Sequence, residues 1–145
     1  GDPEPLRNGS DRPDADLDNA WCGKPGDWIE YRFATPVDLH EARIICDSDL
    51  NRKGQGANAR HGEKNSLSNY PLDQPPRRVP ASLLKQFRIE AQESPEGAWR
   101  VLARQSDAHQ RLLRVPLQGR VSAVRLVPEA TWGTEQVRLF AFDVR

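Results

Sequence analysis

The chain has 145 residues, of which 37% are hydrophobic and 29% charged, and its 21 Lys and Arg balance its 21 Asp and Glu. This length suits one domain. The lack of a basic excess argues against a nucleic-acid or anionic-membrane partner, and no run approaches the roughly 18 apolar residues that span a bilayer. We therefore expect a single domain that binds neither nucleic acid nor membrane.

The opening Gly1-Asp2-Pro3-Glu4-Pro5 has the composition of a linker, and the chain contains no Met. We expect residues 1–6 to be a linker or a tag remnant. Residues 7–145 then form a single domain cut from a longer protein.

Alternation in residues 28–33 predicts the first strand. Ile29, Tyr31 and Phe33 fall on one face, and the charged residues between them fall on the other. A period of two over this length is typical of a half-buried strand. We expect the strand to end at Pro36.

Further short apolar runs predict the remaining strands. A second strand covers about 42–47, and an irregular stretch rich in Gly and Pro follows it over 48–82. Loops of that length are functional or disordered. Beyond the loop we expect a hairpin and three more strands, with a break at Gly119: 85–91, 99–103, 111–117, 121–127 and 137–144.

About seven short strands, and no sustained 3.6-residue apolar period, predict an antiparallel β-sandwich of the jelly-roll type. The alternation also predicts which side chains are buried. The expected core residues are Ile29, Tyr31, Phe33, Ile44, Phe87, Ile89, Leu126, Phe140 and Phe142.

The four Trp residues have different predicted environments. Trp99 alternates within a strand and is expected in the core. Trp28 lies on the face opposite Ile29 and is expected to be half exposed. Trp21 follows an acidic loop, and packing beneath that loop is favoured over ligand contact. Trp132 falls in a loop.

Three segments carry a family resemblance: the acidic loop 14–19 leading to Trp21, the strand 28–37 beginning Trp-Ile-Glu, and the Asp-bearing strand 42–51. They resemble the discoidin-type, galactose-binding-like modules, which implies the jelly-roll fold. With Asn8-Gly9 upstream and 83–90 downstream, the chain resembles the C-terminal sandwich domain of certain bacterial FAD-dependent oxidoreductases. The resemblance covers most of 7–145.

The resemblance implies a non-catalytic accessory module and leaves two functions open. One is a carbohydrate-binding module, with a glycan as the partner. The other is a structural docking domain, with the missing parent domain as the partner. Export or a periplasmic location follows from the resemblance alone.

The resemblance also bears on metal binding, because many relatives hold a structural calcium at the acidic loop. The matching ligands here are Asp14, Asp16 and Asn19, and oxygen ligands of this kind suit calcium. Relatives complete the site with a glutamate in the last strand, where this chain has Ala141. We therefore expect calcium to bind weakly or not at all, and no other cofactor. The alternative is a solvated turn in which these side chains bond their own backbone.

Glycan contacts are expected from loops at one end of the sandwich, since strand faces are committed to the core or to solvent. Sugars stack on rings and hydrogen-bond to polar groups beside them. The expected ligand-binding residues are Trp132, Tyr70, Arg77, Arg78 and Asp49.

Catalysis is not expected. The three His residues are scattered, no nucleophile lies in a recognisable motif, and zinc spacing and nucleotide-binding glycine motifs are missing from the sequence. Cys22 and Cys46 form either one disulfide or, as favoured here, a loop thiol and a buried thiol.

Overall fold

The computed structural model describes residues 1–13, 19–49 and 79–145. Within these ranges a 3-10 helix, η1 (Glu4–Arg7), is followed by six strands. The strands are β1 (Trp21–Gly23), β2 (Ile29–Cys46), β3 (Leu84–Gln92), β4 (Arg100–Gln105), β5 (Leu112–Thr131) and β6 (Val137–Val144). They pair antiparallel in the order β1-β6-β2-β5-β3-β4. No helix of the described segments is long and apolar enough to cross a membrane.

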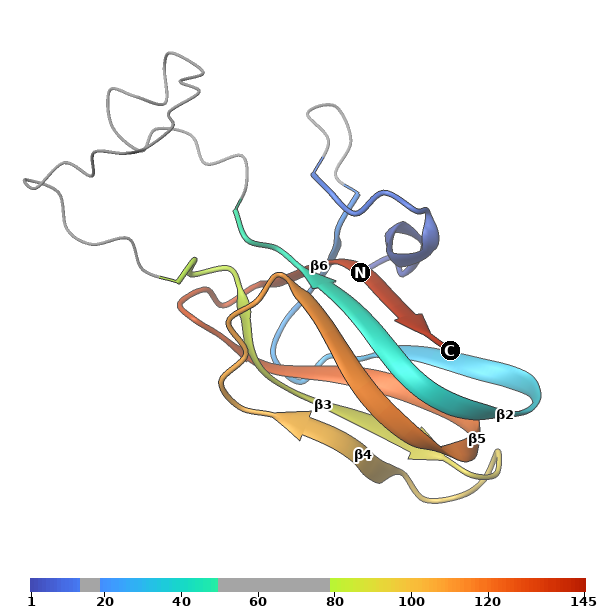
Figure 1. The fold of residues 1–145 in the computed structure, drawn as a ribbon. Helices are drawn as coiled ribbons and strands as arrows, with labels where there is room; N and C mark the ends of the chain where they lie inside the picture. Colours follow the sequence, from blue (N-terminus) through green and yellow to red (C-terminus); the bar gives the residue numbers. More distant parts are fainter. Residues whose placement is uncertain (14–18, 50–78) are drawn as a thin grey trace, which may run out of the picture.

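Two long strands, β2 and β5, fold this sheet over on itself (Figure 1). The first half of β2 pairs with the second half of β5, which continues to β3 and β4; this is layer I. The second half of β2 pairs with the first half of β5 and with β6, which continues to β1; this is layer II. The result is the antiparallel β-sandwich that the sequence predicts.

The corners of the sandwich lie where the sequence predicts strand ends. β2 continues through Pro36, because a register shift between Arg32 and Val37 interrupts the ladder there and the missing N–H of proline costs no sheet bond. β5 continues through Gly119, whose φ of 140° is readily adopted only by glycine. Each pair of expected strands is therefore the two halves of one strand that turns from one layer into the other.

The core between the layers contains most of the predicted side chains. Seven of the nine expected core residues are at most 3% exposed, and Tyr31 and Phe33 are partly buried against them. Tyr31 joins the two layers: its hydroxyl donates to the carbonyl oxygen of Phe142 at 2.6 Å, and its ring lies 5.5 Å from the ring of Phe142. Burial, with the nearby Asp143 carboxylate, raises the pKa of Tyr31.

Three positions differ from the sequence-based expectation. Trp99 is not in the core: it is partly buried on the outer face of layer I, because it lies outside β4, beyond a register shift in the β3–β4 ladder. Trp21 is buried, as favoured, but it lies in a strand rather than a loop and pairs with Leu139 at the edge of layer II. Leu6 of the expected linker is 2% exposed and packs in the core.

The outer face of layer II carries a second apolar cluster. Its members are Ala20, Ile45, Phe140 and Ala141, all less than 9% exposed. Asp11 spans this cluster: its carboxylate accepts from Arg43, and its carbonyl accepts from Arg111. Arg43 precedes Ile45 by two residues on β2, and Arg111 directly precedes β5, beside Cys46, so Asp11 is bonded to both sides of Ile45. The N-terminal segment thus belongs to the folded domain.

Candidate functional site

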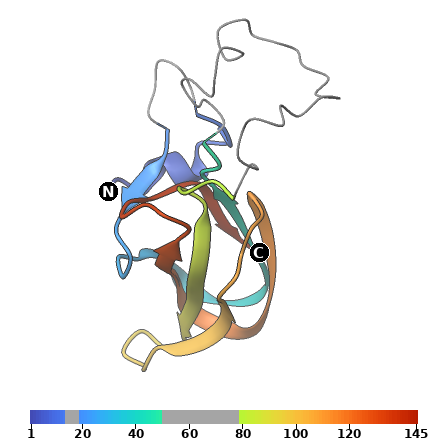
Figure 2. The ribbon, with the colours of Figure 1, turned by 90° about the vertical axis from the view of Figure 1, so that its left-hand side faces the viewer.

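Several strands begin or end together at one end of the sandwich, here called the loop end. The register places the end of β2 beside the starts of β5 and β6, and the end of β5 beside the start of β3. The described residues 47–49 and 79–83 and the segments 106–111 and 132–136 therefore share this end, and Figure 2 views the fold from that side. Of the predicted ligand-binding residues, the structure describes Asp49 and Trp132, and both lie at this end.

Trp132 is the ring that the structure describes at the loop end. Its backbone N–H donates to the carbonyl of Leu83 at 3.1 Å, and its indole Nε1–H donates to the carbonyl of Ala108 at 2.7 Å. The Lys85 ammonium lies 4.7 Å from the ring centroid, within the range of a cation–π contact. Trp132 is nevertheless 36% exposed. The ring is thus held in one orientation with part of its surface open to a ligand.

Asp49 also lies at the loop end and is exposed. Its backbone has a positive φ of 53°, and its N–H donates to the Asp47 carboxylate at 2.8 Å. Asp47 in turn contacts the Arg138 guanidinium at 3.3 Å. These bonds fix the chain where it leaves β2. Tyr70, Arg77 and Arg78 lie outside the described residues.

Asn19 organises the described part of the acidic loop. Its Nδ2 donates to the carbonyl oxygens of Ser10 and Arg12, at 3.2 and 2.5 Å, and to the Ser10 hydroxyl at 2.8 Å. The Asn19 side chain therefore presents its amide nitrogen to these oxygens. A hard cation such as calcium is bound by oxygen atoms, so this nitrogen is not a ligand for it.

The described residues do not fit the calcium site that the resemblance implies. The third carbonyl of the loop, that of Asp11, accepts from Arg111, and the last-strand position is Ala141 at 2% exposure. No group of three or more His, Cys, Asp or Glu in the described ranges could hold a metal ion. Asp14 and Asp16 lie outside the described residues.

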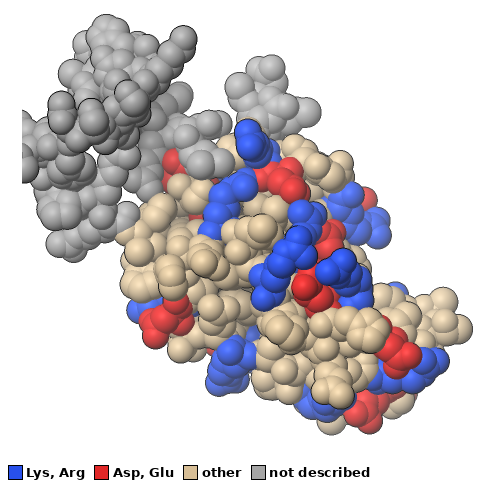
Figure 3. Space-filling view, viewed as in Figure 1, with Lys and Arg blue, Asp and Glu red and all other residues tan. Residues whose placement is uncertain are grey.

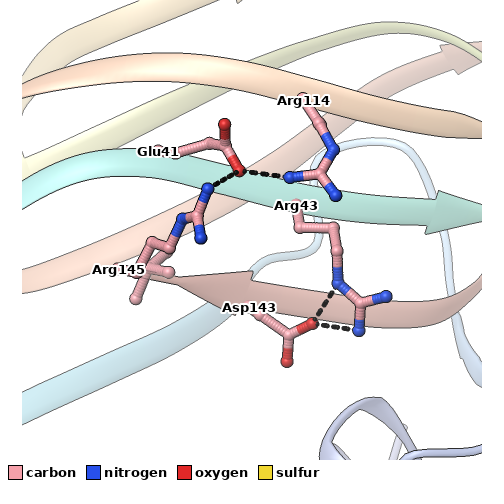
Figure 4. A pocket seen from close by; sticks show the side chains of 6 residues that line it. Glu41, Arg43, Arg114, Asp143 and Arg145 are labelled. Atoms are coloured by element: carbon pink, nitrogen blue, oxygen red, sulfur yellow. Dashed lines mark hydrogen bonds and ion pairs between the residues drawn. The ribbon is translucent and has the colours of Figure 1, made fainter.

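A hollow that sequence reasoning missed lies on the outer face of layer II, with a volume of about 310 Å³ (Figure 4). Arg114 and Arg145 both contact Glu41, at 2.9 and 3.2 Å, and Arg43 contacts Asp143 at 2.6 Å. Alternation along β2 places Glu41 and Arg43 on the surface. Which neighbouring strands bring charged residues to them is decided by the tertiary structure.

Charge in this hollow is balanced, because Arg43 also pairs with Asp11 at 3.0 Å. Its bond to Asp143 raises the pKa of Arg43, although burial works in the opposite direction. Figure 3 likewise shows positive and negative side chains next to one another on this face. The hollow is an ion-pair network rather than a site with surplus charge for an anion.

Neither cysteine is bridged in the structure, in agreement with the favoured expectation. Cys46 is fully buried, and this burial raises the pKa of its thiol to about 12. Cys46 therefore acts as a small core residue rather than as a nucleophile.

Comparison with family models and with curated proteins finds no match. Solved structures do match. The family 32 carbohydrate-binding module of EndoD from Streptococcus pneumoniae has a TM-score of 0.64 at 14% identity, over 99% of this chain and 84% of that one. Chitosan-binding module 1 of a chitosanase/glucanase from Paenibacillus sp. IK-5 has a TM-score of 0.61 at 11% identity, over the same shares.

A third match is a Clostridium perfringens family 32 module, CpGH89CBM32-5, in complex with GalNAc-β-1,3-galactose. Its TM-score is 0.59 at 10% identity, over 96% of this chain and 79% of that one. The chain therefore has the galactose-binding-like sandwich fold of these modules. At such low identity, the matches show the fold alone.

Proposed function

We propose that this domain is a non-catalytic carbohydrate-binding module whose glycan contacts Trp132 at the loop end. The observation that carries the proposal is the Trp132 ring, which two hydrogen bonds hold in place while 36% of the residue stays exposed. The fold supports it, because the modules that share this sandwich over nearly the whole chain include a carbohydrate-binding module, a chitosan-binding module and a module in complex with a disaccharide.

The physical basis is stacking of a sugar on a fixed ring. The apolar C–H face of a pyranose packs on the exposed part of the indole, while its hydroxyls exchange water for nearby polar groups. Lys85, whose ammonium lies against the same ring, supplies three donors at that position. Asp49 supplies an exposed acceptor at the same end. Tyr70, Arg77 and Arg78 complete the proposed set.

One fixed ring and a few exchanged hydrogen bonds support only a weak affinity, millimolar to micromolar, or about −4 to −8 kcal/mol. The test is a glycan array, followed by titration calorimetry of the best ligand on the native chain, Trp132→Ala and Trp132→Phe. We expect the alanine variant to bind about tenfold more weakly or worse. The phenylalanine variant keeps a ring but loses the bond to Ala108, so its affinity should fall in between.

Leu112→Ala is the matched control, because Leu112 is also an exposed apolar residue near the loop end, at 44%, but pairs with Ile45 on layer II rather than joining the contacts of Trp132. If Trp132→Ala binds the glycan with native affinity, the Trp132 ring is not part of the binding site. If no glycan binds the native chain at all, the proposal fails, and docking against a parent domain becomes the function to test.

A further inference from the structure

The outer face of layer I carries two tryptophans and a central arginine. The register aligns a row across the four strands of this layer, Glu30, Arg125, Glu90 and Val101. Trp28 precedes Glu30 by two residues on one edge, and Trp99 precedes Val101 by two on the other. Their ring centroids lie 5.4 and 4.1 Å from the Arg125 guanidinium carbon. Both rings therefore contact one cation in the middle of the sheet.

Most charges on this face are paired with one another, and the exposed Arg104, opposite Arg88 in the register, adds one further cation at the β4 edge. Glu90 is 8% exposed and accepts from Arg88 and Arg125, each at 2.6 Å. Arg88 also donates to Glu129 at 2.6 Å, and Gln86 donates to the same carboxylate. A ligand gains little by competing for these groups.

The rings and the apolar atoms beside them are what this face exposes. Trp28 is 56% exposed, the highest value among the large hydrophobic residues of the described ranges, and Val101 is 48% exposed. The guanidinium of Arg125 holds both rings, so stacking on them costs little side-chain entropy. The surface therefore offers two fixed rings around a closed polar network.

These features fit a sugar better than a protein partner. A protein that covered this face would dehydrate the Glu90 network, which costs free energy even for a paired charge. A sugar chain stacks on the rings and keeps water and hydroxyls beside the charges.

We infer that Trp28 and Trp99 form a second glycan-binding surface, which takes an extended, uncharged polysaccharide chain laid across the strands of layer I. The inference rests on the proposed function for its ligand class. It differs from the loop end in position and in the number of rings. Both ring centroids lie close to the same guanidinium carbon, so a few consecutive sugar units of one chain can contact both rings. Binding should be insensitive to salt, since no unpaired charge is used.

The test compares polymers with short sugars. Affinity electrophoresis in gels containing a soluble β-glucan, a galactan or a galactomannan is run on the native chain, Trp28→Ala, Trp99→Ala, Trp132→Ala and Leu112→Ala. Titration with chitotriose and with GalNAc-β-1,3-galactose is run on the same proteins. Trp28→Ala and Trp99→Ala should bind at least one polymer about tenfold more weakly while keeping native affinity for short sugars. Leu112→Ala should behave as the native chain throughout.

Thermal melts establish that each variant is folded. If Trp99→Ala is unstable, polymer binding by Trp28→Ala still tests the second surface. Native polymer binding in both Trp variants overturns the second surface, while a loss in Trp132→Ala alone leaves the proposed function standing. If neither polymers nor short sugars bind the native chain, both proposals fail. Self-association of the native chain that Trp28→Ala abolishes, without polymer binding, identifies a protein interface and also overturns the inference.

Discussion

The two outer faces of the sandwich depart from simple alternation in opposite ways. On layer II, Ile45 and Phe140 are apolar and point outward, and the segment around Asp11 passes over them. On layer I, Trp28 and Trp99 also point outward, but no contact among the described residues covers Trp28. An apolar residue on an outer face can therefore have one of two roles. If another segment of the chain covers it, the residue extends the core, and if it stays exposed, it marks a surface that can bind a ligand.

The largest difference between the faces should be in folding free energy. Phe140→Ala removes a ring that is 2% exposed and should cost about 3–5 kcal/mol. Trp28→Ala removes a ring that is more than half exposed and should cost less than about 1 kcal/mol. Urea unfolding of both variants measures this difference. Equal losses would mean that layer I is covered as completely as layer II.

The second test concerns the polar network on layer I. Glu90→Gln keeps the shape but removes the charge that Arg88 and Arg125 share, and should cost roughly 1–3 kcal/mol at neutral pH. Asp38→Asn is the matched control: its pair with Arg120 is exposed on both sides, and the change should cost less than about 1 kcal/mol.

The effect of Glu90→Gln should depend on pH. Burial raises the pKa of Glu90, but the hydrogen bonds from Arg88 and Arg125 lower it by more, so the net pKa is below its usual value. The stability from this carboxylate is therefore complete above the pKa of the unfolded chain, about 4.3, and is lost as pH falls through the folded-state pKa. Native chain and variant should converge in unfolding free energy at acid pH. A constant difference from pH 7 downward would contradict the role of the charge.

The smallest expected effect concerns calcium at the N-terminal loop. Because Asn19 and Arg111 already donate to the loop carbonyls, excess calcium chloride should leave the melting temperature unchanged relative to chelator. A specific ligand at about 100 times its dissociation constant would add roughly 2.7 kcal/mol, a shift of several degrees. Such a shift would mean that the Asn19 amide turns its buried, unpartnered Oδ1 toward the loop.

Sequence patterns predicted the strands wherever alternation is strict. β6 has the expected bounds of 137–144, and β3 extends the expected 85–91 by one residue at each end. Trp99 was misassigned because alternation does not say which face of a strand is inward once an edge strand carries a bulge. β1 was missed because three residues are too few to show a period.

The candidate site was also predictable only in part. The sequence predicted that Trp132 lies in a loop, and the structure adds the contacts that hold its ring. The pairing of Trp28 and Trp99 could not be predicted, because 71 positions separate them and only the common contact with Arg125 brings them together.

The sequence by itself determined the all-β class, most strand positions and the greater part of the core, because these depend on the local period of apolar residues. The tertiary structure decided how the strands divide into layers, since β2 and β5 turn their corners at Pro36 and Gly119, where local rules end a strand. It also decided which outward rings remain exposed. Exposure depends on whether another segment of the chain lies over a face, and sequence spacing does not contain that information.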